Sequence, residues 1–289
     1  SGEGWPRVEN LAQKVEFRNE GMSAHILSGR LGDIALGSAD ARYADFKTGE
    51  LSIHVSAGGD AAQAIDFLRA TPLDPAAEHA FSSVEAKGPM QTKVDLFLPF
   101  KDFVHRRVLV HGQMDGVTLN RSGSAVAATD MNGDFDVDGA QVVHADVRGR
   151  VLGGSFQMQA RAPRNRAPTR TQLEFRGTLN GEALRAALAL PPSLSMAGTT
   201  DWRAVLKLSP EPNRESSLRV SSNLPGLQIK LPAPLDKPAD APLPSWFDIE
   251  WPGNGGAQGR LSLGSVVNGS YALEFAAGGM RLAHLALNF

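Results

Sequence analysis

Residues 88–119 read GPMQTKVDLFLPFKDFVHRRVLVHGQMDGVTL, and residues 198–229 read GTTDWRAVLKLSPEPNRESSLRVSSNLPGLQI. A shift of 110 positions (198 minus 88) aligns the two stretches without a gap. Glycine then falls on glycine twice, at 88 with 198 and at 116 with 226, and apolar residues fall on apolar residues. The alternating apolar residues of any two strand-rich segments could be aligned in this way by chance. The matched glycines favour an internal repeat, because glycine is required at particular turn positions.

Both stretches alternate apolar and polar residues, which is the pattern of β-strands with one buried face. The same alternation occurs at residues 15–17, 51–55 and 135–137, so we expect a fold built mainly of strands. Only two segments, near 60–70 and 181–190, have helical spacing. Each ends before a proline, which cannot continue a helix. The sequence therefore predicts an all-β fold with short helices between repeat units.

A shift of 120 (135 minus 15) extends the repeat upstream and places Val15 and Phe17 on Phe135 and Val137. The unit is thus roughly 110 to 120 residues long, which is longer than common solenoid repeats. We expect a first unit at 1–130, a second at 131–246 and the start of a third, truncated unit at 247–289. The stretch 231–245 contains five prolines and is predicted to lack regular strand pairing.

The composition excludes several partner classes. Lys and Arg total 29 against 31 Asp and Glu, and the net charge of −2 gives no reason to expect nucleic acid. There is no cysteine and no apolar run near the ~20 residues that a membrane-spanning helix needs. Both ends are interpreted as cut points, since the C-terminal residues 285–289 stop inside an alternating pattern. The flanking segments of the same longer chain are therefore expected partners.

The sequence offers no catalytic or cofactor signature, and we expect a protein that is not an enzyme. The seven histidines form no zinc motif, and no nucleophile elbow or phosphate-binding loop occurs. Asp134, Asp136 and Asp138 with Gly139 match the start of a calcium loop, but position 12 of that loop is Ala145 rather than Glu. An outward acidic strand explains this spacing better, so no metal is expected.

The apolar positions of the alternating strands are the remaining candidate for function. An open apolar groove and a closed sandwich core produce the same alternation, and only the repeat and the cut ends favour the groove. The alternative is a non-catalytic β-repeat scaffold or adhesin-like module with a closed core that binds protein. The residues predicted to line the groove are Ile53, Val55, Leu96, Leu98, Val108, Val110, Val117, Leu119, Phe135, Val137, Leu206, Leu208, Leu218, Val220, Leu227 and Ile229.

Several landmarks occur in a recognisable order. They are Trp5-Pro6, Val15-x-Phe17, Phe67-Leu68-x-x-Thr71-Pro72-Leu73, Leu96-Phe97-Leu98-Pro99, Asn132-Gly133-Asp134-Phe135, Leu152-Gly153-Gly154 and the stretch SNLPGLQIKLPAPLDK at 222–237. In this order they resemble the AsmA-like superfamily, specifically its YhdP-type branch, over nearly the whole chain. The last stretch is the most specific.

This resemblance implies an elongated, curved β-groove that carries phospholipid through its apolar interior. It also implies a periplasmic location in a protein of a Gram-negative bacterium that is anchored to the inner membrane outside this fragment. The expected function is that of the middle segment of a bridge-like conduit between the inner and outer membranes. Phospholipid acyl chains are the expected ligand, and the family has no catalytic residues to transfer.

Overall fold

The fold is all-β, as the alternation predicts. The computed structural model describes residues 8–18, 21–31, 34–45, 47, 49–69, 83–99, 101, 105–122, 125–139, 141–161, 171–209, 216–231, 236–251, 256–276 and 279–288. These residues form eighteen β-strands in an open antiparallel sheet, together with two short α-helices. Neither helix of the described chain is long and apolar enough to span a membrane.

Contacts divide the chain into two compact units, Ser1–Ser122 with Asp130–Ala145 and Gly123–Thr129 with Asp146–Phe289. Strands β8 (Ala127–Asp138) and β9 (Gln141–Val151) contribute residues to both units. The other elements of unit 1 are β1 (Val8–Arg18), β2 (Gly21–Leu31), β3 (Ile34–Tyr43), β4 (Glu50–Asp60), α1 (Ala61–Arg69), β5 (Val84–Lys87), β6 (Pro89–Pro99) and β7 (Arg107–Arg121). The other elements of unit 2 are β10 (Gly154–Arg161), β11 (Thr171–Asn180), α3 (Gly181–Ala187), β12 (Ser195–Leu208), β13 (Ser216–Ser222), β14 (Leu227–Lys230), β15 (Ser245–Trp251), β16 (Gly256–Leu263), β17 (Val267–Ala276) and β18 (Gly279–Asn288).

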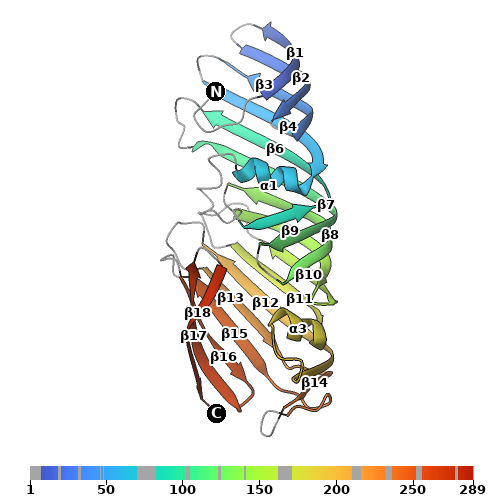
Figure 1. The fold of residues 1–289 in the computed structure, drawn as a ribbon. Helices are drawn as coiled ribbons and strands as arrows, with labels where there is room; N and C mark the ends of the chain where they lie inside the picture. The colour runs from blue at the N-terminus through green and yellow to red at the C-terminus, as the bar shows by residue number, and fades with distance from the viewer. Residues whose placement is uncertain are drawn as a thin grey trace. The chain divides into compact units, whose positions relative to one another are not determined.

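Within each unit, every strand pairs mainly with its neighbour along the chain. In unit 1 the antiparallel pairs run β1–β2, β2–β3, β3–β4, β4–β6 and β6–β7, and β5 pairs with β7. In unit 2 they run from β10 through β13 and from β15 through β18, with β13 next to β15 and β14 next to β12. Figure 1 shows this succession of strands in each unit.

The strand register of unit 1 recurs in unit 2. Leu96 pairs with Val108, and 110 positions later Leu206 pairs with Leu218. Lys87 pairs with Thr118, and Ala197 pairs with Gln228 at the same shift. The order strand, helix, strand is also shared, because α1 follows β4 and α3 follows β11. The repeated sequence pattern therefore corresponds to a repeated pairing pattern. The boundaries of the sequence repeats at 130 and 246, which differ from those of the two compact units, stay a prediction.

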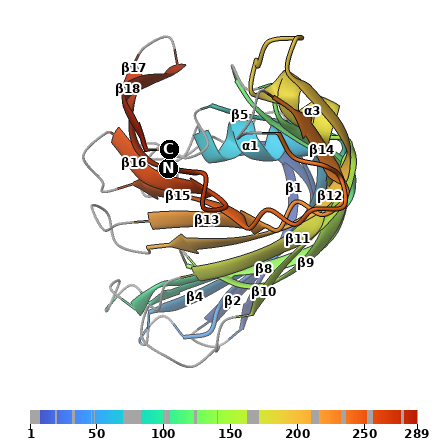
Figure 2. The same cartoon turned by 90° about the horizontal axis from the view of Figure 1, so that it is seen from below.

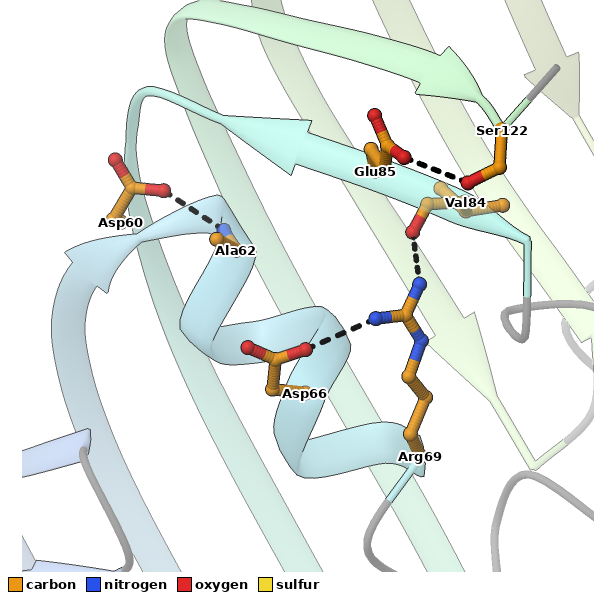
Figure 3. Close-up of polar contacts among 7 residues, drawn as sticks. All are labelled: Asp60, Ala62, Asp66, Arg69, Val84, Glu85 and Ser122. Atoms are coloured by element: carbon orange, nitrogen blue, oxygen red, sulfur yellow. Dashed lines mark hydrogen bonds and ion pairs between the residues drawn. The ribbon is translucent and has the colours of Figure 1, made fainter. Parts of the chain in front are cut away.

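Each helix begins at a polar side chain that caps its free backbone N–H groups. Asp60 accepts hydrogen bonds from the backbone N–H of Ala62 at 2.9 Å and of Gly88 at 3.1 Å, and the first of these is drawn in Figure 3. These two bonds hold the pKa of the Asp60 carboxyl below its usual value. Asn180 accepts from the N–H of Ala183 at 3.1 Å in the same way. Asp60 is thus the N-cap of α1, while Pro72, the proline that follows this helical segment, lies outside the described residues.

Within the Pro-rich stretch 231–245, residues 236–244 contain no regular strand, as predicted, but Ser245 already belongs to β15, contrary to the prediction, and residues 232–235 lie outside the described residues. One isolated bridge joins Lys237 to Ile229, and the backbone N–H and C=O of both residues bond each other at 2.9 Å. The Lys237 side chain is 3% exposed, and its Nζ donates to the carbonyl oxygens of Leu227 at 2.6 Å and Pro238 at 3.0 Å. Removal from water lowers the pKa of this amine. Lys237 therefore fixes the stretch against β14.

Candidate functional site

The strands of unit 1 present one apolar side. Ile53 on β4 pairs with Leu96 on β6, which pairs with Val108 on β7. The next row on the same side contains Val55, opposite Val94. Alternate residues of a strand point to opposite faces, so these side chains share one face. We call it the apolar face of unit 1, formed by Val15, Phe17, Met22, Ala24, Ile26, Ala39, Ala41, Tyr43, Leu51, Ile53, Val55, Val94, Leu96, Leu98, Val108 and Val110.

Unit 2 has an equivalent face. Leu206 on β12 lies between Leu173 on β11 and Leu218 on β13, and Leu218 pairs in turn with Ile249 on β15. The apolar face of unit 2 is formed by Met158, Ala160, Leu173, Phe175, Ala204, Leu206, Leu208, Leu218, Val220, Phe247, Ile249, Trp251, Ala257, Leu261, Tyr271, Leu273, Leu285 and Leu287. Sequence reasoning singled out only part of this set, although Phe175, Phe247 and Ile249 alternate just as clearly.

The opposite side of the sheet of unit 1 contains a polar row, although it also contains Phe97, which is 39% exposed. In unit 1 a single row across β2, β3, β4 and β6 contains His25, Asp40, His54 and Asp95. The Nδ1 atom of His25 lies 2.5 Å from Asp40 Oδ1, and that of His54 lies 2.6 Å from Asp95 Oδ1. All four residues belong to the water-facing side of an amphipathic sheet. The chemical contrast between the two faces is what makes the apolar one a candidate site.

Large side chains of the apolar face remain accessible. Phe17 is 71% exposed, Leu285 is 48% exposed and Phe247 is 38% exposed. Most other members are half-buried, since their own neighbours in the sheet cover their flanks and, among the described residues, no second sheet of the same unit covers their tips. A contiguous exposed apolar surface is unfavourable in water and usually marks a binding surface. Each unit therefore presents an apolar sheet face of the kind that normally packs against a second layer.

The helices cover one end of these faces. Val117 is 1% exposed and Leu227 is 0% exposed. A Cβ placed on Gly181, the first residue of α3, would lie 2.5 Å from a methyl carbon of Leu227, so the helix rests directly on this side chain. Figure 2 shows α1 on the inner side of the bend of its strands. Leu227 thus forms a core beneath α3, and Val117, which corresponds to it at the shift of 110, is equally buried. Leu119 and Ile229 beside them are half-buried.

A bulge brings Val117 to the apolar side. Met90 pairs with Met114 and Lys87 with Thr118, so β7 contains one more residue than its partner between these pairs. Gly116 lies at this point with φ +68°, a conformation that favours glycine. Without the extra residue, Val117 would share the polar side with His111. The alternating pattern of the sequence does not reveal that the side chains switch faces at this bulge. The glycine that recurs at 116 and 226 is the feature that indicates it.

Aromatic rings lie over bare backbone on the apolar faces. A Cβ on Gly112 would lie 2.2 Å from the ring of Phe135, so Phe135, which is half-buried like Val137, crosses this glycine. Tyr271 likewise crosses Gly259 and donates its hydroxyl to the Asp248 carbonyl oxygen at 2.5 Å. Burial raises the pKa of this phenol to about 12. Sequence reasoning missed Tyr271.

The three aspartates that resemble a calcium loop have separate basic partners. Asp134 lies 3.1 Å from His144, and Asp136 lies 2.8 Å from His111. Asp138 accepts two hydrogen bonds from Arg107, at 2.7 and 3.1 Å. Their side chains therefore serve cross-strand pairs rather than one shared cation. Over the described ranges, no group of three or more His, Asp or Glu side chains is arranged to hold a metal.

Comparison with known proteins identifies one family. No curated protein and no solved structure matches the chain significantly. A sequence model described as YhdP protein matches residues 2–289, which is nearly the whole chain. The match agrees with the landmarks in the sequence and with the open, all-β sheet. The chain belongs to the YhdP family.

Proposed function

We propose that this chain is a middle segment of a periplasmic conduit that moves phospholipid between the inner and outer membranes along its apolar faces. The observation that carries the proposal is the uncovered apolar side of each single-layer sheet, exemplified by Phe17 and Leu285. Membership of the YhdP family supports it. In this proposal, flanking segments of the same chain would continue the path and connect it to a membrane anchor.

The energetics of lipid transfer suit such a surface. Each exposed CH₂ of an acyl chain costs about 0.8 kcal/mol in water, so an apolar face removes much of the barrier to transfer. The contacts come from many similar side chains, such as Leu206, Leu218 and Ile249, that recur from strand to strand. Weak and repeated contacts let a lipid slide, whereas a deep specific pocket would hold it. No catalytic group is required.

The alternative of a closed scaffold core is less consistent with the geometry. A closed sandwich would bury the large side chains of both inner faces. Here Leu208, Phe247 and Leu285 remain 36% or more exposed. A protein-binding scaffold would also have no need for the same apolar face in each unit.

Site-specific cross-linking tests the proposal. A photoreactive amino acid would replace Leu206 on the apolar face or Lys207 on the polar face of the same strand, in the full-length protein in living cells. We expect phospholipid adducts from position 206 and few from position 207. Equal labelling at the two positions, or none at 206 in a folded protein, would refute the conduit.

A further inference from the structure

A pocket of about 360 Å³ lies beside α3 in unit 2. Its walls come from α3, from the connection that follows it and from the start of β12, and they include Glu182, Arg185, Leu194 and Met196. This volume lies within the range of small-molecule sites. The pocket is separate from the apolar face rows centred on Leu206, which lie further along β12.

The two charged residues of this pocket are spaced to pair with each other, yet they do not. Glu182 and Arg185 are three positions apart on one helix, where opposite charges normally meet. Over the described residues no ion pair joins them, and Arg185 instead donates a hydrogen bond from Nη1 to the Leu190 carbonyl oxygen at 3.2 Å. A guanidinium has five N–H donors, so donors remain for a ligand. An anionic group and a cationic group therefore flank one cavity.

Helix α1 provides the contrast within the same chain. There Asp66 and Arg69, also three positions apart, form an ion pair of 3.0 Å, as Figure 3 shows. Arg69 also donates to the Val84 carbonyl oxygen, which ties the helix to β5. The positions of α1 that correspond to Glu182 and Arg185 are Ala62 and Ile65. The open pair of opposite charges is thus a feature of unit 2 rather than of the repeat.

We propose that the α3 pocket binds a zwitterion made of an ammonium group and a phosphate. Glu182 accepts hydrogen bonds from the ammonium, and Arg185 donates to the phosphate in the paired geometry that guanidinium and phosphate favour. Leu194 and Met196 provide apolar contact for the linking carbons. Such a group occurs as a lipid headgroup and as a free phosphoethanolamine. The headgroup source rests on the proposed function; binding of the zwitterion itself does not.

Calorimetric titration of the purified chain with phosphoethanolamine tests the site. Glycerol 3-phosphate lacks the ammonium and ethanolamine lacks the phosphate, so each removes one contact. We expect phosphoethanolamine to bind at least about tenfold more tightly than either, as expected for one charge-assisted hydrogen bond. Equal affinity for phosphoethanolamine and glycerol 3-phosphate would overturn the proposal.

Variants assign the two roles. Glu182→Gln should reduce phosphoethanolamine affinity to that of glycerol 3-phosphate, and Arg185→Gln should abolish binding of both phosphates. Arg185→Lys keeps a positive charge and should retain part of the affinity, which separates loss of contact from loss of folding. Asp66→Asn on α1 is the matched control and should leave binding unchanged. Unaltered binding in Glu182→Gln and Arg185→Gln, or an equal loss in Asp66→Asn, would contradict the assignment.

A second experiment tests whether the bound zwitterion is a lipid headgroup or free phosphoethanolamine. Lysophosphatidylethanolamine should bind more tightly than phosphoethanolamine if its acyl chain adds apolar contacts beyond the pocket. Lipid binding no tighter than that of phosphoethanolamine would overturn the headgroup source. Absence of phosphoethanolamine binding alongside successful cross-linking at position 206 would refute this pocket and leave the conduit standing.

Discussion

Gly198 and Gly226 meet where β12 and β14 bend away from the rest of the sheet of unit 2. A Cβ built on Gly198 would lie 2.1 Å from the Gly226 carbonyl oxygen, and both residues have positive φ, +92° and +76°. In unit 1, Gly88 and Gly116 occupy the corresponding positions and also have positive φ. The backbone approach that only glycine permits is therefore what turns the sheet under each helix.

Replacing Gly198 with Ala should destabilise the chain by about 2 kcal/mol or more, because the new methyl group meets backbone and the φ value is strained for alanine. Chemical denaturation would measure the loss. Gly58→Ala on β4 is the matched control, since nothing lies within 4 Å of a Cβ there and Gly58 has no positive φ. A Gly198→Ala protein as stable as Gly58→Ala would show that the bend does not require glycine.

Asp60→Ala should destabilise the chain by about 1 kcal/mol, because α1 loses its N-cap. The pKa of Asp60 is lowered in the folded state, so its carboxylate contributes stability above the unfolded value of 3.8, and the contribution is lost as the pH falls through the lower folded value. Asp60→Asn keeps one acceptor, as Asn180 does in α3, and should lose this acid dependence. Urea unfolding at pH 7 and pH 3 would compare the three proteins. Equal acid sensitivity of wild type and Asp60→Asn would contradict the role of the carboxylate.

The strands and the repeat could be predicted from sequence because the apolar rows, the caps and the paired glycines are local or periodic signals. Leu96 and Leu206 stand in matching registers, as the shift of 110 indicates. What could not be predicted is which apolar residues the helices cover. Leu227 and Leu206 have the same kind of alternation, yet Leu227 is buried because α3 packs on it. Alternation in the sequence shows which side chains share one face of the sheet, whereas the exposure of each side chain depends on what packs against that face.

The tyrosine over Gly259 should titrate abnormally. The chain has two tyrosines, so Tyr43→Phe leaves Tyr271 as the sole phenol, and its ultraviolet absorbance should titrate with a midpoint of about 12 in the folded protein. Because the folded pKa lies above the ordinary value of 10.0, the related stability is present below pH 10 and is lost as the pH rises through about 12. A midpoint near 10 under folded conditions would mean that Tyr271 is solvated.

Tyr271→Phe should separate the ring from the hydroxyl. It keeps the cover over Gly259 but removes the hydrogen bond to the Asp248 carbonyl oxygen, and we expect a loss of about 1 kcal/mol in unfolding free energy. Tyr271→Ala removes the ring as well and should cost more, since bare backbone is then exposed to water. If the two variants were equally stable, the ring would contribute nothing over the glycine.

Leu206→Asp distinguishes an open lipid path from a closed core. Leu206 is half-buried in the row between Leu173 and Leu218, and an aspartate there places a charge on the proposed path. A lone carboxylate among apolar groups costs several kcal/mol or takes up a proton, so bound lipid should be strongly reduced. The fold should largely survive, because water reaches an open face when no lipid is present.

The matched control is Val205→Asp, one residue along β12 on the polar side, which should leave both lipid cross-linking and melting temperature nearly unchanged. In a closed core, by contrast, the buried unpaired charge of Leu206→Asp would lower the melting temperature sharply and reduce the soluble yield. Thermal unfolding and lipid cross-linking on the same preparations therefore separate the two cases. A Leu206→Asp protein that is strongly destabilised relative to Val205→Asp would count against the conduit, whereas a stable protein that no longer cross-links lipid would support it.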